Sequence, residues 1–277
     1  MYKDKTVWIT GASSGIGEAL ALALAAQDAR LILSARKQET LDLVKQECQK
    51  KLPDQSDERL FVLPLDVTDE ASLAVKTEQA KAFTGRIDLL INNAGISQRS
   101  ECVNTDMQTY RTLFEVNVFG QIALTKLVLP IMIDQGEGHI AITSSVAGKI
   151  GVPFRTGYCA AKHAVMGFFD ALRTEVAHNN IAVSTITPGF IRTNISANAL
   201  RADGTPYGTV DHDIQGGMDA DECAQVILEG LTNRKPEIAV GKGMEMHALW
   251  IKRYFPKSIF KLLQKEYVKR SARSDFK

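Results

Sequence analysis

The sequence lacks the residue patterns of a metal site. Its four cysteines are scattered through 277 residues, and none of its five histidines belongs to a His-Glu-x-x-His motif. We therefore expect reduced thiols and no catalytic metal at the residues concerned, which are Cys48, Cys102, Cys159, Cys223, His139, His163, His178, His212 and His247.

Long apolar runs and a leader peptide are also missing. The apolar stretch 127–133 is soon interrupted by Asp134, whereas a membrane-spanning helix needs about 20 predominantly apolar residues. The chain begins Met-Tyr-Lys and reaches its first apolar run within a few residues. These features predict a cytoplasmic protein without a membrane-spanning helix.

The chain as a whole has almost no net charge, but the two signs are unevenly distributed along it. The formal net charge is +1, but residues 242–277 hold ten Lys or Arg against three acidic residues, so the other 241 residues carry −6. An acidic body argues against nucleic-acid binding, while the basic tail favours an anionic surface. Trp250, Phe255 and Phe260 lie among its lysines, which is typical of an interfacial helix. The same aromatics could equally close a substrate cleft or pack on another subunit.

Apolar, β-branched runs alternate with longer helical patterns, which is typical of β-α-β units. Strands are expected at 6–10, 30–35, 60–65, 88–92, 139–144, 181–187 and 237–240. Helices are expected at 16–27, 38–51, 69–84, 106–135, 156–179 and 219–232. The order predicts an α/β fold with one doubly wound parallel sheet, the Rossmann fold, and right-handed crossovers.

A single catalytic domain over residues 1–241 and a basic, amphipathic helical extension over 242–277 are expected. Within the domain, residues 190–218 are irregular and rich in glycine, which predicts a flap over a substrate site. An ordinary surface connection would show the same composition.

A glycine-rich turn, Thr10-Gly-Ala-Ser-Ser-Gly-Ile-Gly17, follows the first expected strand and opens an Ala/Leu-rich helix. Glycine lets the backbone approach phosphate oxygens, and the helix N-terminus supplies amide donors and partial positive charge. In this context Gly11, Gly15 and Gly17 predict a site for the pyrophosphate of a dinucleotide.

The end of the second strand indicates which dinucleotide is bound. An acidic residue there would bind a ribose 2′-hydroxyl, but the strand ends at Arg36, whose planar fork suits a 2′-phosphate. Lys37 and Ser34 could assist, so NADP(H) is favoured over NAD(H), although a solvated Arg36 is also possible. Asp66, after the third strand, could accept a bond from an adenine amino group or pair with local amides.

Tyr158 and Lys162 stand four residues apart on an expected helix, and Ser145 lies thirteen residues before Tyr158. Residues i and i+4 share one helix face, so the phenol and the ammonium can point into the same cleft.

These residues together resemble the short-chain dehydrogenase/reductase family, from Thr6 to about Val240. The motifs occur in the family's order: the glycine turn, Asp66, Asn92-Asn93-Ala94-Gly95, then Asn117, Ser145, Tyr158 and Lys162, and finally Pro188-Gly189 with Thr193. Residues 34–37 and 188–208 are similar to the branch holding the 11β-hydroxysteroid dehydrogenases and the dehydrogenase/reductase member 7 group. Ala161 departs from the family, which often has Ser or Thr before the lysine.

The resemblance implies catalytic roles for four residues. Tyr158 would be the acid/base, Lys162 would lower the pKa of its phenol, Ser145 would donate to the substrate oxygen, and Asn117 would hold a water. Without the resemblance, Asn117 would be read as a polar packing residue. The expected cofactor contacts are Gly11, Ser13, Ser14, Gly15, Ile16, Gly17, Arg36, Lys37, Asp66, Val67, Asn93, Ala94, Gly95, Tyr158, Lys162, Pro188, Gly189, Ile191 and Thr193.

The expected function is an NADP(H)-dependent oxidoreductase that interconverts a secondary alcohol with an aldehyde or ketone of moderately apolar character. Two alternatives stay open, a non-catalytic NADP(H)-binding regulatory protein and an NAD-dependent dehydrogenase, because fold does not decide function. Family resemblance also implies a homodimer or homotetramer built from the helices that carry Asn117 and Tyr158. Steroid, retinoid, fatty-acyl and small aromatic carbonyls all fit the sequence.

Overall fold

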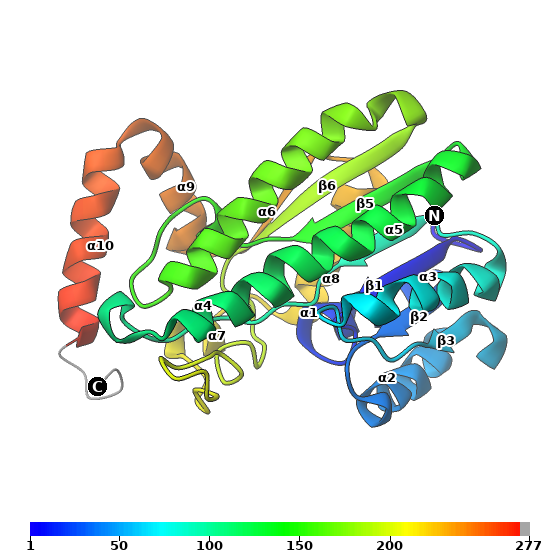
Figure 1. Ribbon diagram of the computed structural model, residues 1–277, viewed down its shortest axis with the longest axis horizontal. Coiled ribbons are helices and arrows are strands. Elements are labelled where there is room, and N and C mark those ends of the chain that lie inside the picture. Colours follow the sequence, from blue (N-terminus) through cyan, green and yellow to red (C-terminus); the bar gives the residue numbers. More distant parts are fainter. Residues whose placement is uncertain (272–277) are drawn as a thin grey trace.

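Seven short strands pair in parallel in one sheet, and the computed structural model describes residues 1–271. The sheet order is β3-β2-β1-β4-β5-β6-β7 (Figure 1). From β1 the chain adds strands first on one side (β2, β3) and then on the other (β4 to β7), so the strand order reverses between β1 and β4. Ligands of open α/β sheets bind at such a switch point. The strands are β1 (Thr6–Thr10), β2 (Arg30–Ser34), β3 (Leu60–Val62), β4 (Leu89–Asn92), β5 (Gly138–Thr143), β6 (Ile181–Pro188) and β7 (Glu237–Val240).

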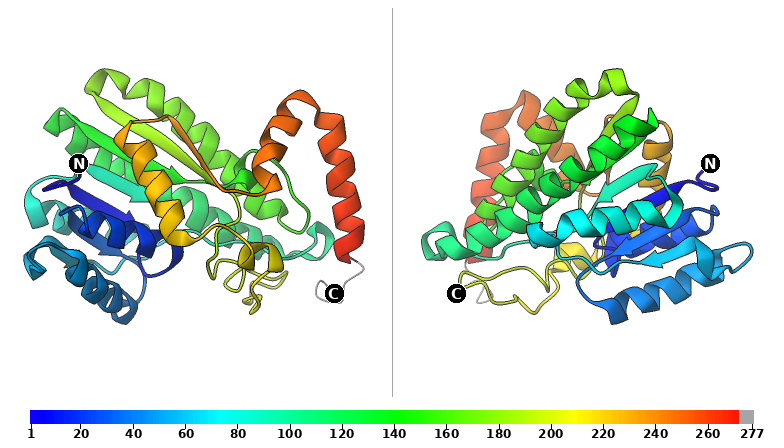
Figure 2. Two further views of the ribbon diagram at one scale, coloured as in Figure 1. Left: turned by 180° about the vertical axis from the view of Figure 1, so that it is seen from behind. Right: turned by 45° about the vertical axis from the view of Figure 1, so that its right-hand side comes forward.

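Helices cover both faces of the sheet, because each parallel crossover must pack on it. One layer holds α1 (Gly15–Ala25), α2 (Gln38–Lys51) and α8 (Ala220–Thr232). The other holds α3 (Glu70–Thr84), α5 (Gly120–Gln135) and α6 (Thr156–Glu175). Figure 1 shows α3, α5 and α6 in front of the sheet, and the reverse view in Figure 2 brings α8 forward.

The alternation of side chains along β1 divides the core between the two layers. Val7 and Ile9 pack with α1 and α8, whereas Trp8 points to the opposite layer, and all three are fully buried. Ile32 lies in the same layer as Trp8, so β2 follows the same alternation. The expected doubly wound parallel sheet is thus confirmed.

The expected helix 106–135 is continuous but not uniform. It consists of α4 (Met107–Phe114), a π-helical turn (Glu115–Phe119) and α5. Contrary to the expectation from Asp134, the segment Met107–Gln135 is long and apolar enough to span a membrane. Half of its most apolar window is buried within the protein, where Leu124 and Val128 pack under the sheet. A core helix meets the same criteria of length and composition.

The segment 190–218 contains one short helix, α7 (His212–Gln215), and is otherwise irregular. Beyond β7, α9 (Met244–Tyr254) and α10 (Pro256–Ser271) form an arm at one end of the molecule (Figure 1). The arm reaches back to the body through a Tyr267 hydroxyl that donates to Glu101 at 2.8 Å and through an Arg270–Asp213 ion pair. The last six residues of the expected extension, 272–277, lie outside the described part of the chain.

Candidate active site

The candidate residues gather at the carboxyl ends of the central strands. β1 leads into the glycine turn, β4 into Asn93–Gly95, β5 into Ser144 and Ser145, and β6 into Gly189. Because these four strands are neighbours in the sheet, residues distant in the sequence meet at the switch point.

The glycine turn is a tight cradle. Gly11 and Gly15 have φ angles of +65° and +59°, a region that favours glycine. A Cβ on Gly15 would come within 3.0 Å of the Thr193 methyl carbon, so the expected phosphate turn and the segment after β6 face each other across a narrow gap. Ser14 is extended and its side chain does not cap α1. The first amides of α1 thus point toward a space suited to phosphate.

Asn93 holds the turn from behind. Its Nδ2 donates to the Thr10 carbonyl at 3.2 Å, and its Oδ1 accepts from the Thr143 hydroxyl at 3.2 Å. The Thr10 hydroxyl accepts from the amides of Asn93 and Ala94 at 3.0 and 3.1 Å. Both the side chain and the amide of Asn93 therefore act within the protein.

The far end of the site carries an exposed cationic pair. Arg36 and Lys37 follow β2, are both exposed, and form no ion pair within residues 1–271. The expected help from Ser34 is wrong: its buried hydroxyl donates to the Leu63 carbonyl at 2.7 Å and accepts from the Trp8 indole at 2.9 Å. That hydroxyl is committed to the core.

Asp66 is exposed at the same edge of the sheet. Its Oδ1 accepts from the Thr68 amide and hydroxyl at 2.9 and 2.8 Å, a local turn of the kind that aspartate favours. The bond to local amides is therefore made, and Asp66 Oδ2 makes no hydrogen bond among the described residues. Val67 is buried, and its carbonyl lies where a Cβ on Gly120 would stand.

Tyr158 and Lys162 lie on one face of α6, with the ammonium 5.8 Å from the centre of the phenol ring. The Ser145 hydroxyl accepts from the Ala147 amide at 3.1 Å and lies close enough to the Tyr158 phenol to lower its pKa. Ser144 differs, because its hydroxyl donates to the Lys162 carbonyl at 3.1 Å and holds the helix. Ser145, Tyr158 and Lys162 are thus brought together, as the sequence predicts.

Asn117 sits in the π-helical turn and is fully buried. Its Nδ2 donates to the carbonyls of Ile96 and Leu113 at 3.0 and 2.9 Å, and its Oδ1 accepts from the Ile96 amide at 3.2 Å. A Cβ on Gly95 would lie 2.8 Å from that oxygen and 3.5 Å from the Lys162 nitrogen. Asn117 therefore fixes the strand end beside Lys162 through its side chain.

Burial dominates the protonation of the pair. Desolvation raises the pKa of Tyr158, partly offset by the Ser145 hydroxyl, and lowers the pKa of Lys162 to about 7. The ammonium donates to the Thr143 carbonyl at 2.7 Å. The expected fall in the pKa of Tyr158 is wrong for this structure, because burial outweighs the nearby cations.

Two features of the site escaped the sequence. Gln98 is fully buried, and its Oε1 accepts from the Gly157 and Tyr158 amides at 2.7 and 3.3 Å, which caps the first turn of α6. Arg99, which is buried, and Arg155, whose side chain is 14% exposed, lie close to Tyr158 and share the carboxylate of Asp211. The sequence signal that could have indicated them is the polar run Ser97 to Ser100, which comes directly after the Asn-Asn-Ala-Gly-Ile segment 92–96.

Comparison with known proteins decides the family. The model for short chain dehydrogenase matches residues 5–204, most of the chain. This protein belongs to the short-chain dehydrogenase family. It is therefore an oxidoreductase of the dehydrogenase/reductase type.

Relatives in animals match along nearly the whole chain. It is 40% identical to a dehydrogenase/reductase SDR family protein 7-like of Drosophila melanogaster, over 96% of this chain and 81% of the relative. It is also 40% identical to the human dehydrogenase/reductase SDR family member 7, over 91% of this chain and 75% of the relative. The resemblance to the member 7 group is thereby confirmed.

Solved structures share the fold. A short-chain dehydrogenase from Streptomyces avermitilis has a TM-score of 0.78 and 30% identity, with 98% of each chain covered. Levodione reductase has a TM-score of 0.79 and 27% identity, covering 89% of this chain and 99% of that enzyme.

Proposed function

We propose that this chain is an NADP(H)-dependent oxidoreductase that interconverts a secondary alcohol with an aldehyde or ketone of moderately apolar character. The observation that carries the proposal is the meeting of Ser145, Tyr158 and Lys162 beside the glycine cradle. A phenol, a hydroxyl donor and an ammonium in one buried cleft suit proton transfer to a carbonyl oxygen.

The cradle fits a dinucleotide. Gly11, Gly15 and the uncapped start of α1 would hold the pyrophosphate, while Gly189, Ile191 and Thr193 close the opposite wall. The exposed Arg36 and Lys37 would hold a 2′-phosphate, which supports NADP(H). The other proposed contacts are Ser13, Ser14, Ile16, Gly17, Asp66, Val67, Asn93, Ala94, Gly95, Tyr158, Lys162 and Pro188.

A nicotinamide held beside this cradle would supply the hydride for reduction or accept it during oxidation. Tyr158 gives its proton to the carbonyl oxygen during reduction and takes it back during oxidation. Ser145, which lies beside the Tyr158 phenol, donates to the same oxygen as charge develops there. The Lys162 ammonium stabilises the phenolate, and Asn117 holds the backbone beside it. The water that the family resemblance assigns to Asn117 would lie next to this ammonium.

Replacing Tyr158 with Phe tests the reaction. The variant keeps the ring and its packing but loses the only atom assigned to proton transfer, so turnover of carbonyl substrates should fall at least about a thousandfold. NADPH binding, followed by quenching of Trp8 and Trp250 fluorescence, should be nearly unchanged. A variant with full activity would remove Tyr158 as the acid/base.

Cofactor choice is tested by the same titration with NADPH and NADH. NADPH should bind more tightly, and Arg36→Ala should weaken NADPH binding by about tenfold while leaving NADH unchanged, because only NADPH carries the 2′-phosphate. Arg111→Ala, at an exposed position on α4, is the matched control. Preference for NADH in the unmodified protein would overturn the NADP(H) assignment.

Three further parts of the proposal concern the surroundings of the site. Residues 1–241 form the catalytic domain, with 190–218 as its substrate flap, and 242–277 form the extension.

The protein would be a homodimer or homotetramer through α4, α5 and α6. The exposed Phe119 supports this assembly, and light scattering would test it. A reducing, cytoplasmic location is supported by four free thiols, of which Cys102 is exposed, and is testable by cell fractionation.

A further inference from the structure

Two buried guanidiniums share one carboxylate beside the candidate active site. Arg99 and Arg155 both pair with Asp211 Oδ2, the second at 3.2 Å. The side chains are 2% and 14% exposed for the arginines and 11% for the aspartate. Neither arginine has another acidic partner among residues 1–271, so the cluster carries one uncompensated positive charge. Such a charge is costly to bury.

The cluster surrounds the start of the catalytic helix. Arg155 lies three residues before Tyr158, and Arg99 follows Gln98, which caps the Tyr158 amide. Asp211 comes from the flap, so the ion pairs tie the flap to both walls of the cleft. Both guanidiniums are close enough to Tyr158 to act on its charge.

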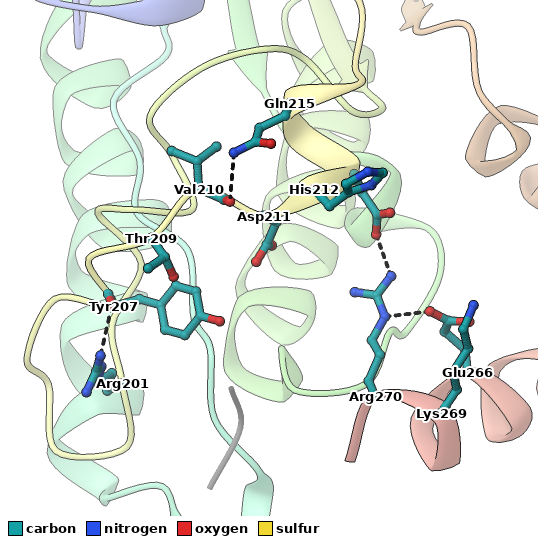
Figure 3. A pocket seen from close by; sticks show the side chains of 11 residues that line it. Arg201, Tyr207, Thr209, Val210, Asp211, His212, Gln215, Glu266, Lys269 and Arg270 are labelled. Atoms are coloured by element: carbon teal, nitrogen blue, oxygen red, sulfur yellow. Dashed lines mark hydrogen bonds and ion pairs between the residues drawn. The ribbon is translucent and has the colours of Figure 1, made fainter. Parts of the chain in front are cut away.

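A cavity of about 660 Å³ opens beside this cluster, and Asp211 is the member of the cluster that lines it. Asp211 lines it together with Arg201 and Tyr207 from the flap and Lys269 and Arg270 from α10 (Figure 3). Arg270 is already paired with Asp213 and Glu266. Because Asp211 is already paired with the two arginines, the rest of the lining has three basic residues against two acidic ones. The lining therefore adds to the positive surplus at the two guanidiniums instead of cancelling it.

We propose that Arg99 and Arg155 bind a carboxylate of the substrate, so that the enzyme acts on apolar carbonyl compounds carrying one carboxylate. The proposal rests on the proposed function and narrows its substrate class. The carboxylate would take the guanidinium donors that Asp211 leaves, and planar guanidinium suits such an oxyanion. It takes no part in the reaction, in which hydride adds to the carbonyl carbon and a proton to the oxygen.

Burial supports this reading in a second way. It lowers the pKa of Arg99 to about 8, with the charge of Arg155 adding to the effect. A second anion beside the pair would relieve this energetic cost. The alternative is that the surplus positive charge stabilises the Tyr158 phenolate, because the two arginines also lower the pKa of Tyr158.

The test compares aryl oxo-acids with their methyl esters. The series starts at benzoylformate, and the number of methylene groups between carbonyl and carboxylate increases along it. Reduction by NADPH is followed for the unmodified protein, Arg155→Gln and the control Arg111→Gln. Binding of the corresponding hydroxy acids and hydroxy esters to the NADP⁺ complex is measured by calorimetry, which does not need turnover.

We expect at least one acid to exceed its ester in kcat/KM and in affinity by about tenfold or more, because a site built for a charged group rejects its neutral analogue. Arg155→Gln should lower kcat/KM for the acids at least about tenfold more than for their esters, while Arg111→Gln keeps the preference for the acids. Esters that match or exceed their acids throughout the series would overturn the proposal. So would an equal loss for acid and ester with a raised pKa in the rate profile, since the arginines would then serve Tyr158.

A second variant covers the case in which Arg155→Gln does not fold. Asp211→Asn removes the competing internal carboxylate, so acids should bind at least as tightly as before, and a bound acid should raise Tm more than its ester does. Loss of acid binding in Asp211→Asn would contradict the proposal. Preferential acid binding without turnover would instead sink the proposed reaction, whereas turnover without acid preference would sink only the carboxylate site.

Discussion

Lys162 shows how burial sets chemistry at a single residue. Its side chain is almost inaccessible, and its ammonium donates to one protein acceptor, the Thr143 carbonyl. No acidic side chain forms an ion pair with it within residues 1–271. A cation held this way is costly for the free protein and useful to a phenolate or a ribose hydroxyl. Function and stability therefore oppose each other at this position.

Stability should depend on pH through Lys162. Its folded pKa of about 7 lies below its ordinary value of 10.5, so the unfolded chain binds more protons and stability rises with pH. Between about pH 6 and pH 9 the contribution should be about 2–3 kcal/mol. Lys162→Met should remove most of the pH dependence of the unfolding free energy in this range. Its gain in stability over the unmodified protein should be largest at the acidic end.

Urea unfolding without added cofactor, compared between the two proteins across that pH range, measures the difference. Lys126→Met, at an exposed position of α5 on the same face of the sheet, is the control and should leave the profile unchanged. A pH dependence that survives in Lys162→Met would assign it to other groups.

Residue-level sequence reasoning succeeded where a side chain's role follows from spacing. Tyr158 and Lys162 share a helix face at any packing angle, and Gly11 and Gly15 need positive φ. The prediction that Ser34 helps to bind the 2′-phosphate was wrong. Side chains alternate along a strand, so Ser34 shares a face with buried Ile32 and points into the core. The predicted fall in the pKa of Tyr158 was wrong because burial, which raises it, depends on the packing of the folded chain.

At the scale of elements, the strands were predictable because short aliphatic runs end at turns, and each lies within a few residues of its expected range. The π-helical turn was not, because it accompanies contacts of Asn117 with Ile96, a residue distant along the chain. The cap on α6 was hidden for the same reason. Helix starts normally use a local side chain, yet here Gln98 comes from the loop after β4.

Gln98→Met should therefore weaken both the protein and its reaction. It leaves the amides of Gly157 and Tyr158 without their acceptor, at about 1–3 kcal/mol for each buried donor. Because Tyr158 begins in this turn, kcat should fall more than KM rises. Thermal unfolding and steady-state kinetics together measure the two effects.

Gln98→Glu provides the conservative comparison, since it keeps an acceptor for both amides and adds a negative charge near a helix N-terminus. It should recover most of the lost Tm and kcat. Gln38→Met, at an exposed position whose amide donates to Asp42, controls for the loss of a glutamine as such. If Gln98→Met loses Tm but keeps kcat, the residue is structural only.

At the scale of the whole molecule, the arm of α9 and α10 has two unlike sides. Tyr267 stacks on Phe154 with ring centres 5.3 Å apart, and Arg270 reaches the flap, so one side covers the cleft. The other side is exposed and apolar: Trp250 and Phe255 are 67% and 66% exposed. The sequence left cleft closure and lipid binding as alternatives, and the geometry allows both at once.

We expect the exposed side to bind anionic lipid weakly. Exposed aromatics beside lysines suit the membrane interface, and each basic residue near an anionic surface contributes about 1 kcal/mol. Co-sedimentation with phosphatidylserine vesicles should therefore be detectable at low salt and be lost when residues 250–277 are deleted. Vesicles of phosphatidylcholine alone should bind much less, since the charge term is absent.

Deletion also removes the contacts of Tyr267 and Arg270 with the body, so a gentler variant is needed. Lys257→Glu with Lys261→Glu changes only exposed positions of α10 and keeps the cleft cover intact. It should abolish vesicle binding while reductase activity in solution stays within about twofold, because those lysines contact neither the flap nor Tyr158. Binding that persists in the deletion variant would show that the arm is not a lipid-binding element, and its aromatic side would then be assigned to contact with another subunit.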